Sequence, residues 1–409
     1  MSRTPVRRQT LSRLFIEFVQ DERASGLLLL ACLALSLLAT NSPVGPLWAG
    51  FWHAKVPLTL GPLNFHYTVE HWVNDGLMTV FFLLIGIEIR RELLVGELSN
   101  PRNASLPILA ALGGMLVPIL LHQALNFGTP TQRGFAIPMA TDIAFTLGIL
   151  SLLGPRAPAS LKVFLTALAI VDDLGAILVI GLFFSSGLQG LALLGALAVF
   201  IVLGVLGRSG RARALPIYVV GGLVLWGLMS QSGVHPTLAG VMLAFTLPFD
   251  RDPAQSLSHQ LEHALSKPVA FVIMPIFVMA NTALLLRAEA FANLITPNDI
   301  GIFLGLVVGK PLGVLLLSWA GVRLGLSRLQ ADLTWRHILG GGMLAGIGFT
   351  MSFFITYLAF ADAAVIESAK LSILISSFVA GTAGFVALSR IHARGSARAL
   401  PAEAESIDG

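Results

Sequence analysis

The sequence has little charge and almost no cysteine. Only 12% of its 409 residues are Asp, Glu, Lys or Arg, whereas a soluble domain carries about 25%. So few charges could not cover the 55% of hydrophobic residues in water, which disfavours a soluble enzyme, a disordered protein and a nucleic-acid-binding protein. The single cysteine, Cys32, excludes an internal disulfide framework and a cysteine metal cluster. The protein is therefore expected to lie in lipid.

Long apolar runs fill most of the chain, and its mean hydropathy is +0.82. A membrane-spanning helix needs about 20 mostly apolar residues. We predict an all-α polytopic membrane protein with about twelve such helices in one domain, residues 25–392, between a cytoplasmic segment, 1–24, and a disordered cytoplasmic tail, 393–409. The predicted spans are 25–42, 72–94, 104–125, 134–153, 160–184, 189–207, 215–229, 234–248, 268–286, 300–322, 337–360 and 368–389.

The distribution of Lys and Arg predicts the orientation of these spans, because cytoplasmic loops hold the excess of positive charge. With the N-terminus inside, 21 of the 26 Lys and Arg residues fall on the inner side. The outer segments hold four, and the one cation assigned to neither side, Lys310, lies deep inside a span and is the only buried cation predicted. Both termini are therefore predicted to be cytoplasmic. The four outer cations are Lys55, Arg133, Arg287 and Lys370.

Two segments outside the spans have patterns of their own. Residues 54–68 alternate apolar and polar side chains around a Gly61-Pro62 turn, which predicts a small extracytoplasmic β-hairpin. Residues 11–18 place four apolar side chains on one helical face, which predicts a helix in the inner membrane interface. A partly ordered tail is the alternative for that segment.

Four ionisable residues lie at membrane depth: Asp142, Asp172, Asp173 and Lys310. Each would cost about 2.5–3.5 kcal/mol if it were unpaired at the centre of a spanning helix. We therefore expect all four to face one another or water. In a purely structural alternative, Lys310 pairs with one aspartate to lock the bundle, but this leaves two carboxylates without a partner.

Two spans contain residues that interrupt a helix. Pro138 lies in the run GFAIPMATDIAF, and the run GGGMLAGIGFTMS holds five glycines, with Gly346, Gly348 and Thr350 in its second half. Interrupted spans occur only where the freed backbone groups are buried in protein or line a watery cavity. The half-helix ends carry partial charges that acids and a lysine can balance. Close helix packing at small residues is the alternative for the glycine run.

Six strings resemble those of the NhaA family of sodium/proton antiporters and are spread over most of the chain. The resemblance implies inverted repeats with two interrupted helices that cross near the midplane, a homodimer, and a location in the bacterial cytoplasmic (inner) membrane. The strings are ATDIAF (140–145), ALAIVDDLGAI (167–177), GKPLG (309–313), GIGFTMS (346–352), SGVHPTLAG (232–240) and NDGLMTVFFLLIGIEIRRE (74–92).

The resemblance also implies roles for the residues at membrane depth. Asp173 is implied to be the more direct sodium ligand, and Asp172 to take part in binding while it exchanges partners with Lys310. Thr141 is expected to add an oxygen ligand. Asp142 and Lys310 are implied to compensate the positive and negative half-helix ends. Carboxylate and hydroxyl oxygens are the ligands that a hard cation such as Na⁺ prefers.

These residues predict an exchange of ions. Burial raises the pKa of a carboxyl group and a bound cation lowers it, so protons and sodium compete for the same oxygens. We therefore expect a secondary active transporter, not an enzyme: an electrogenic, pH-dependent Na⁺(Li⁺)/H⁺ antiporter that works by alternating access. It needs no resident cofactor, and its partners are Na⁺, Li⁺, H⁺ and the lipid bilayer.

A further group of residues is implied to sense pH. His suits this role because its charge changes near neutrality, although a solvated cytoplasmic face explains the inner residues equally well, and His235 could serve in packing. The segment before the ninth span departs from the family pattern at His259-Gln260 and Ser266, so the pH set point is not predicted. The pH-response candidates are Glu88, Glu92, Glu262, His263 and His259 at the inner face and His235 at the outer face.

Two other functions are alternatives to antiport. An intramembrane aspartyl protease would use one aspartate as acid and one as base, but the adjacent Asp172-Asp173 pair and the lysine at the same depth disfavour it. A sodium- or proton-coupled transporter of an organic solute is the remaining alternative. An organic anion would call for an unmatched basic or aromatic-lined site, whereas Lys310 is already matched by acids.

Overall fold

The structure, a computed structural model, describes residues 22–60, 63–154, 157–185, 187–209, 214–252, 255–286 and 294–398. Within these residues, nine helices are long and apolar enough to cross a membrane, and two bent helix pairs raise the number to as many as eleven. This confirms the all-α polytopic membrane fold. The predicted interfacial helix at 11–18 lies outside the described residues, as does most of the predicted tail, although the last helix continues to Arg398.

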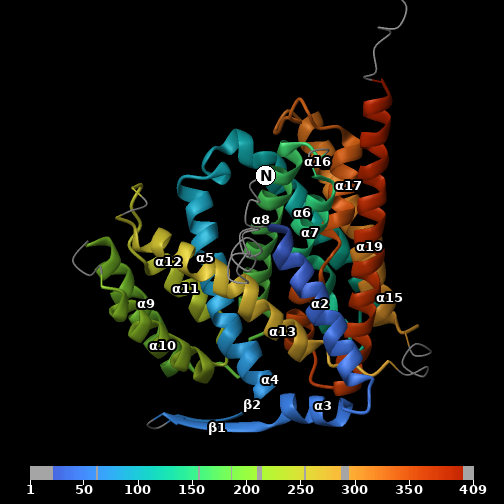
Figure 1. The fold of residues 1–409 in the computed structure, drawn as a ribbon. Helices are drawn as coiled ribbons and strands as arrows, with labels where there is room; N and C mark the ends of the chain where they lie inside the picture. The colour runs from blue at the N-terminus through green and yellow to red at the C-terminus, as the bar shows by residue number, and fades with distance from the viewer. Residues whose placement is uncertain are drawn as a thin grey trace, which may run out of the picture.

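The elements follow one another along the chain as in Figure 1. They are α2 (Glu22–Thr40), α3 (Gly45–His53), β1 (Lys55–Leu60), β2 (Leu63–Thr68), α4 (Val69–Trp72), the π-helical η1 (Val73–Leu77), α5 (Met78–Leu94), η2 (Glu97–Ser99), α6 (Pro101–Asn126), the 3₁₀-helical η3 (Gln132–Met139), α7 (Ile143–Leu152), α8 (Ala159–Phe183), α9 (Gly190–Arg208), α10 (Leu215–Ser232), α11 (Leu238–Thr246), α12 (Leu257–Pro268), η5 (Val269–Ile273), α13 (Met274–Asn281), α15 (Pro297–Leu304), η6 (Gly305–Gly309), α16 (Lys310–Arg323), α17 (Trp335–Ala345), α18 (Phe349–Ala359) and α19 (Ala363–Arg398).

The predicted β-hairpin is confirmed. Strands β1 and β2 pair antiparallel, with Lys55 opposite Thr68 and Leu60 opposite Leu63. Figure 1 shows the hairpin beside α3 at the lower edge of the molecule, whereas the C-terminal part of α19 rises at the upper edge. We call the lower edge the hairpin end. In the predicted topology it faces the extracytoplasmic side.

Three sequence predictions need correction. The eighth span, 234–248, contains only the nine-residue helix α11, about 13 Å long, which cannot cross a core of about 30 Å by itself. The ninth span begins earlier than 268, because Leu257–Asn281 forms one continuous helical segment. Lys370 was assigned to an outer segment, but it lies in α19 and is only 5% exposed. Lys310 is therefore not the only buried cation.

The helices pack in two groups. The first, which we call the site group, consists of η3, α6 to α8 and α15 to α19: α6 packs on α8, α15 and α16, and α19 packs on α15, α17 and α18. The second, the flanking group, consists of α2 to α5 and α9 to α13: α5 packs on α11, α9 on α10 and α11, and α2 on α13. Contacts between the groups run from α2 to α7, from α5 to α8 and from α13 to α18.

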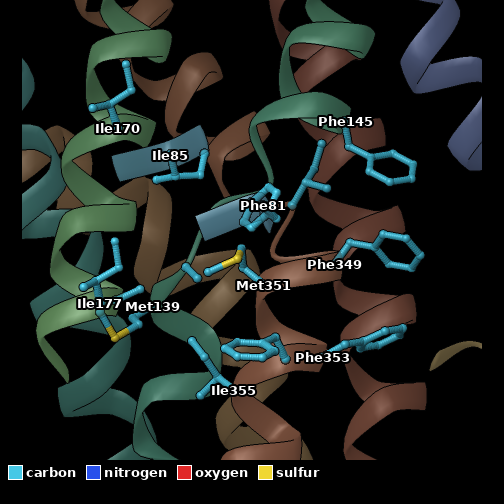
Figure 2. Packing of buried hydrophobic residues seen from close by; sticks show 14 of the residues in the cluster. Phe81, Ile85, Met139, Phe145, Ile170, Ile177, Phe349, Met351, Phe353 and Ile355 are labelled. Atoms are coloured by element: carbon cyan, nitrogen blue, oxygen red, sulfur yellow. The ribbon is translucent and has the colours of Figure 1, made fainter. Parts of the chain in front are cut away.

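An apolar layer surrounds the two interrupted spans. Phe145, Phe349 and Phe353 form a ladder, with ring centres 4.7 Å and 5.1 Å apart. Figure 2 shows these rings on one side of the breaks and Ile170 and Ile177 of α8 on the other. All five side chains are buried. Polar groups inside this layer have little access to water and must find partners in the protein.

Candidate functional site

Both predicted helix interruptions are present, and they touch each other. The fourth span is 3₁₀-helical up to Met139, extended at Ala140 and Asp142, and α-helical from Ile143. The eleventh span breaks between α17 and α18 with a bend of 49°. The backbone N–H of Asp142 donates to the carbonyl of Ile347 at 2.7 Å. The two breaks therefore share a backbone hydrogen bond, and each supplies a partner for a group that a continuous helix would have bonded internally.

Asp142 lies where two helices begin. Its carboxylate accepts the backbone N–H of Phe145 in α7 at 3.1 Å and that of Thr350 in α18 at 3.2 Å, as well as the hydroxyl of Thr350. The first turn of a helix carries unpaired N–H groups and partial positive charge. One buried carboxylate, 2% exposed, thus caps the N-termini of both half-helices.

The carbonyl ends of the half-helices are bonded to side chains of the opposite span. The hydroxyl of Thr146 in α7 donates to the carbonyl of Leu344 at 3.0 Å. In the other direction, the hydroxyl of Ser352 in α18 donates to the carbonyl of Ile137 at 2.7 Å. Neither residue was predicted from the sequence. The signal available was a hydroxyl one helical turn after each break, because Thr146 follows Asp142 and Ser352 follows Gly348 at that spacing.

Lys310 and Asp172 form an ion pair at the end of η3. The Lys310 ammonium donates to a carboxylate oxygen of Asp172 and to the carbonyl of Met139, the last residue of η3. Both side chains are fully buried. The hydroxyl of Thr141 lies 2.6 Å from the same Asp172 oxygen and 2.9 Å from the carbonyl of Ala345. Lysine, aspartate and threonine thus meet at the carbonyl ends of both half-helices.

The two adjacent aspartates of α8 have carboxylate oxygens without partners. Asp173 is 2% exposed, and no hydrogen bond to its Oδ1 is seen among the described residues; the same holds for Oδ1 of Asp172. Buried polar atoms in proteins are nearly always bonded, so these oxygens are suited to a proton or a cation. No group of three or more His, Cys, Asp or Glu in the described part of the chain could hold a metal ion. Carboxylate oxygens are the kind of ligand that hard cations prefer.

Glycines allow the elements around the site to approach closely. A Cβ at Gly346 would lie 2.4 Å from the carbonyl of Leu306, and one at Gly348 would lie 2.2 Å from the hydroxyl of Ser352. A Cβ at Gly305 would lie 2.5 Å from Pro138. The glycine run therefore serves close packing as well as the helix break, so the two interpretations of that run are both correct.

The pH-response candidates of the inner face lie on α5 and the 257–281 helix. The Arg91 guanidinium is 2.5 Å from Glu262 and 2.9 Å from Glu92, and it joins the two carboxylates. Glu88 is half-buried one turn before Glu92. His259 packs against Phe249 with ring centres 5.2 Å apart, and His263 is exposed. The structure thus brings Glu92 and Glu262 together, whereas their response to pH stays a prediction.

His235 lies apart from the other pH-response candidates, in the turn between α10 and α11. Its ring bonds to the hydroxyl of Thr237 at 2.7 Å and lies 3.6 Å from Asp75, which is 3.0 Å from His71. The ring also packs on Phe354. This position, near the hairpin end, agrees with both the packing role and the sensing role considered for His235.

A second polar cluster at the hairpin end was missed by the sequence analysis. Glu70 of α4 accepts a hydrogen bond from the Tyr357 hydroxyl of α18, and Lys370 of α19 lies 3.8 Å from the same carboxylate. These residues lie near the predicted ends of spans, where charge is ordinary. The one available signal was that Lys370 falls just inside the predicted span 368–389.

Comparison with known proteins identifies the family to which the chain is similar. The sequence profile of a family described as "Na⁺/H⁺ antiporter 1" matches residues 16–388. An NhaA Na⁺/H⁺ antiporter of Dechloromonas aromatica is 55% identical over 382 residues, 93% of this chain and 96% of the relative. NhaA 1 of Flavobacterium johnsoniae is 50% identical over 381 residues, 93% and 98% of the two chains. NhaA of Shewanella loihica is 47% identical over 378 residues, 91% and 96% of the two chains.

Proposed function

Because this chain belongs to the NhaA family of Na⁺/H⁺ antiporters, we propose that it exports Na⁺ or Li⁺ in exchange for protons at the Asp172–Asp173 site. The proposal rests on one observation above the others: two buried, adjacent carboxylates each have an oxygen without a hydrogen-bond partner among the described residues. The protein is proposed to act in the bacterial cytoplasmic membrane, with both termini cytoplasmic and as a homodimer. Its activity is transport and not an enzymatic reaction.

Competition between ions supplies the coupling. The Asp172 carboxylate is held by Lys310 and Thr141, and arrival of Na⁺ at the aspartates would weaken the hold of the ammonium by adding a second positive charge. Protons and Na⁺ neutralise the same oxygens. An empty site would leave two negative charges buried, which is unfavourable in free energy. The site therefore crosses the membrane loaded with one ion or the other.

Several groups titrate together in this site. Asp172, Asp173 and Lys310 are close enough to interact strongly, so the protons they release belong to the coupled cluster and not to one residue. More than one proton can return for each Na⁺, which makes the proposed exchange electrogenic. The pH dependence follows from the same competition, because a higher proton concentration occupies the oxygens that Na⁺ needs.

The remaining alternative, a coupled transporter of an organic solute, finds less support. The side chains of Asp172, Asp173 and Lys310 are at most 2% exposed, so a solute larger than an ion would have to force the surrounding helices apart. The caps on the half-helices leave oxygens unpaired only at the two aspartates among the site residues described above.

Transport in vesicles tests the proposal. Purified protein in vesicles with an imposed pH gradient should dissipate the gradient when Na⁺ or Li⁺ is added. Asp172→Asn and Asp173→Asn should each abolish this response, because an amide neither binds Na⁺ as a carboxylate does nor carries the exchanged proton. Asp332→Asn is the matched control, since Asp332 is exposed, and it should transport like the parent. A gradient indifferent to both cations in the parent protein would refute antiport.

A further inference from the structure

The Glu70 cluster joins the two groups of helices at the hairpin end. Glu70 belongs to α4 of the flanking group, whereas Tyr357 and Lys370 belong to α18 and α19 of the site group. The Tyr357 hydroxyl donates to Glu70, Lys370 lies 3.8 Å from it, and His53 lies 3.7 Å from its other oxygen. By contrast, the pairs Arg91–Glu262 and Lys310–Asp172 each join helices of the same group.

The cluster is mostly shielded from water. The side chain of Glu70 is 12% exposed and that of Lys370 is 7% exposed. The Lys370 ammonium also lies 4.6 Å from the centre of the Tyr357 ring, in a cation–π contact. Buried charges are stable only while their partners stay in place. Separation of α4 from α18 and α19 would therefore have to expose both charges to water.

The two groups of helices also meet through contacts that involve no polar bond. Where α2 of the flanking group meets α7 of the site group, a Cβ at Gly26 would lie 3.3 Å from the Cα of Gly148. Small residues that form no hydrogen bonds with each other allow two helices to shift with little loss of interaction free energy. Phe82 of α5 also packs on Phe354 of α18, with ring centres 5.3 Å apart, so the cluster at the hairpin end is a polar attachment beside apolar contacts between the groups.

A cavity of about 590 Å³ adjoins the cluster. Its walls come from α2 and α3, α13, α18 and α19, so it lies between the two groups at the hairpin end. Glu70, Tyr357 and Lys370 line it, as does Ala280 of α13, which is only 2% exposed. A cavity at this boundary would widen if the cluster separated.

The cluster also connects to the ion site through one half-helix. Tyr357 follows Thr350 by about two turns of α18, so both lie on nearly the same face. Thr350 donates its hydroxyl and its N–H to Asp142. If Tyr357 released Glu70 and α18 moved, Thr350 would move with it. The hydrogen bonds from Thr350 to Asp142, beside Asp172 and Lys310, would therefore change.

We propose that Glu70, Tyr357 and Lys370 form a gate at the hairpin end that keeps the antiporter closed on that side. The gate opens when the site group moves away from α4, and the cavity then becomes the path between the ion site and the extracytoplasmic solution. Glu70 and Tyr357 are positioning residues, since they act through α18 and touch no transported ion. The inference rests on the alternating access proposed above.

Cysteine labelling tests the gate without depending on transport. In a Cys32→Ser background, Ala280→Cys places one thiol in the cavity wall. A membrane-impermeant thiol reagent is added from the hairpin side. Tyr357→Phe removes a single hydroxyl and keeps the ring that Lys370 contacts, so the variant should fold. The closed state then has one hydrogen bond fewer, which shifts the equilibrium toward the open state. The rate of thiol labelling should therefore rise about fivefold.

A nearby acid supplies the matched control. Glu367 lines the same cavity but is exposed and lies on α19 with Lys370. Glu367→Gln removes the same kind of charge without breaking the attachment of α4, and it should leave the labelling rate unchanged. Glu70→Gln keeps an acceptor for Tyr357 but leaves the buried Lys370 without the carboxylate that faces it, so its labelling rate should rise at least as much as that of Tyr357→Phe.

Transport measured from each side separates positioning from a general loss of structure. Tyr357→Phe should lower the ratio of the apparent KM for Na⁺ on the hairpin side to that on the opposite side, because the site opens more often toward the hairpin end. Equal labelling of Tyr357→Phe and parent, or an equal rise in Glu367→Gln, would overturn the gate. Failure of the Asp172→Asn transport test alone would leave the labelling result intact, so the two proposals fail separately.

Discussion

At the scale of single residues, Thr350 determines how well Asp142 is bonded. Its hydroxyl and N–H both reach the same carboxylate oxygen. Thr350→Val keeps the shape of the side chain and removes the hydroxyl, which leaves a buried carboxylate with one donor fewer. We expect this to lower the free energy of unfolding by about 1–3 kcal/mol. Thermal unfolding of the purified protein in detergent measures the change.

The matched variant for this prediction is Thr350→Ser. It retains the hydroxyl and removes one methyl group, so its unfolding temperature should lie close to that of the parent. Unfolding temperatures that fall equally in Thr350→Val and Thr350→Ser would show that packing, and not the hydrogen bond to Asp142, stabilises this position.

Residues at the centre of a span could be predicted from the sequence, whereas residues at the edges could not. Asp142, Asp172 and Lys310 were identified because charge at membrane depth is expensive and therefore rare. Glu70 and Lys370 were missed because their positions near span ends gave no such signal. Their partnership depends on how α4 and α19 meet in space, and sequence spacing does not contain that information.

At the scale of helices, the position of Lys310 depends on how closely α16 approaches α6. A Cβ at Gly113 of α6 would lie 2.0 Å from the carbonyl of Gly313 in α16. Gly113→Ala must therefore push the two backbones apart, which moves Lys310 away from Asp172. We expect a lower unfolding temperature, because the packed backbones are forced apart. We also expect a transport rate reduced by about tenfold or more, because Lys310 and Asp172 no longer lie in the positions that ion exchange needs.

Gly204 is the control for the same substitution. It lies inside α9, and a Cβ there would meet no atom within 4 Å. Gly204→Ala should leave transport unchanged and should not lower the unfolding temperature, because alanine favours a helix over glycine by about 1 kcal/mol. If Gly113→Ala behaved like Gly204→Ala, the close approach of α6 and α16 would not matter for the site.

The helix breaks were predictable, but the lengths of some spans were not. Pro138 and the glycines at 346 and 348 marked both interruptions because each weakens a helix locally. The apolar run at 234–248 looked like a full span, yet only Leu238–Thr246 is helical. Hydropathy measures how apolar a segment is, and it does not distinguish a short buried helix from one that crosses the membrane.

At the scale of the whole molecule, the helices pack in the two groups described above. The ion site lies within the site group, because Asp142, Asp172 and Lys310 come from elements that pack on one another. The contacts that hold the two groups together therefore regulate access to the site without forming part of it. This division was not predictable from the sequence, since each group combines two blocks of helices that are separated along the chain.

Ion binding should stabilise the whole folded protein. A ligand that binds only the folded state raises its stability by about 2.7 kcal/mol at one hundred times its Kd. In detergent at alkaline pH, NaCl or LiCl should therefore raise the unfolding temperature above that measured in choline chloride at equal ionic strength. Asp173→Asn should lose this difference, because it removes one of the two carboxylates with an unpaired oxygen, whereas the exposed Asp332→Asn should keep it.

The size of this stabilisation should depend on pH in a defined direction. Protons and Na⁺ compete for the oxygens of Asp172 and Asp173, so acidification fills the site with protons and lowers the apparent affinity for Na⁺. The difference in unfolding temperature between NaCl and choline chloride should therefore shrink as the pH falls and should grow as it rises. A difference that stayed constant from acidic to alkaline pH would show that Na⁺ binds away from groups that exchange protons, and this result would contradict competition as the source of coupling.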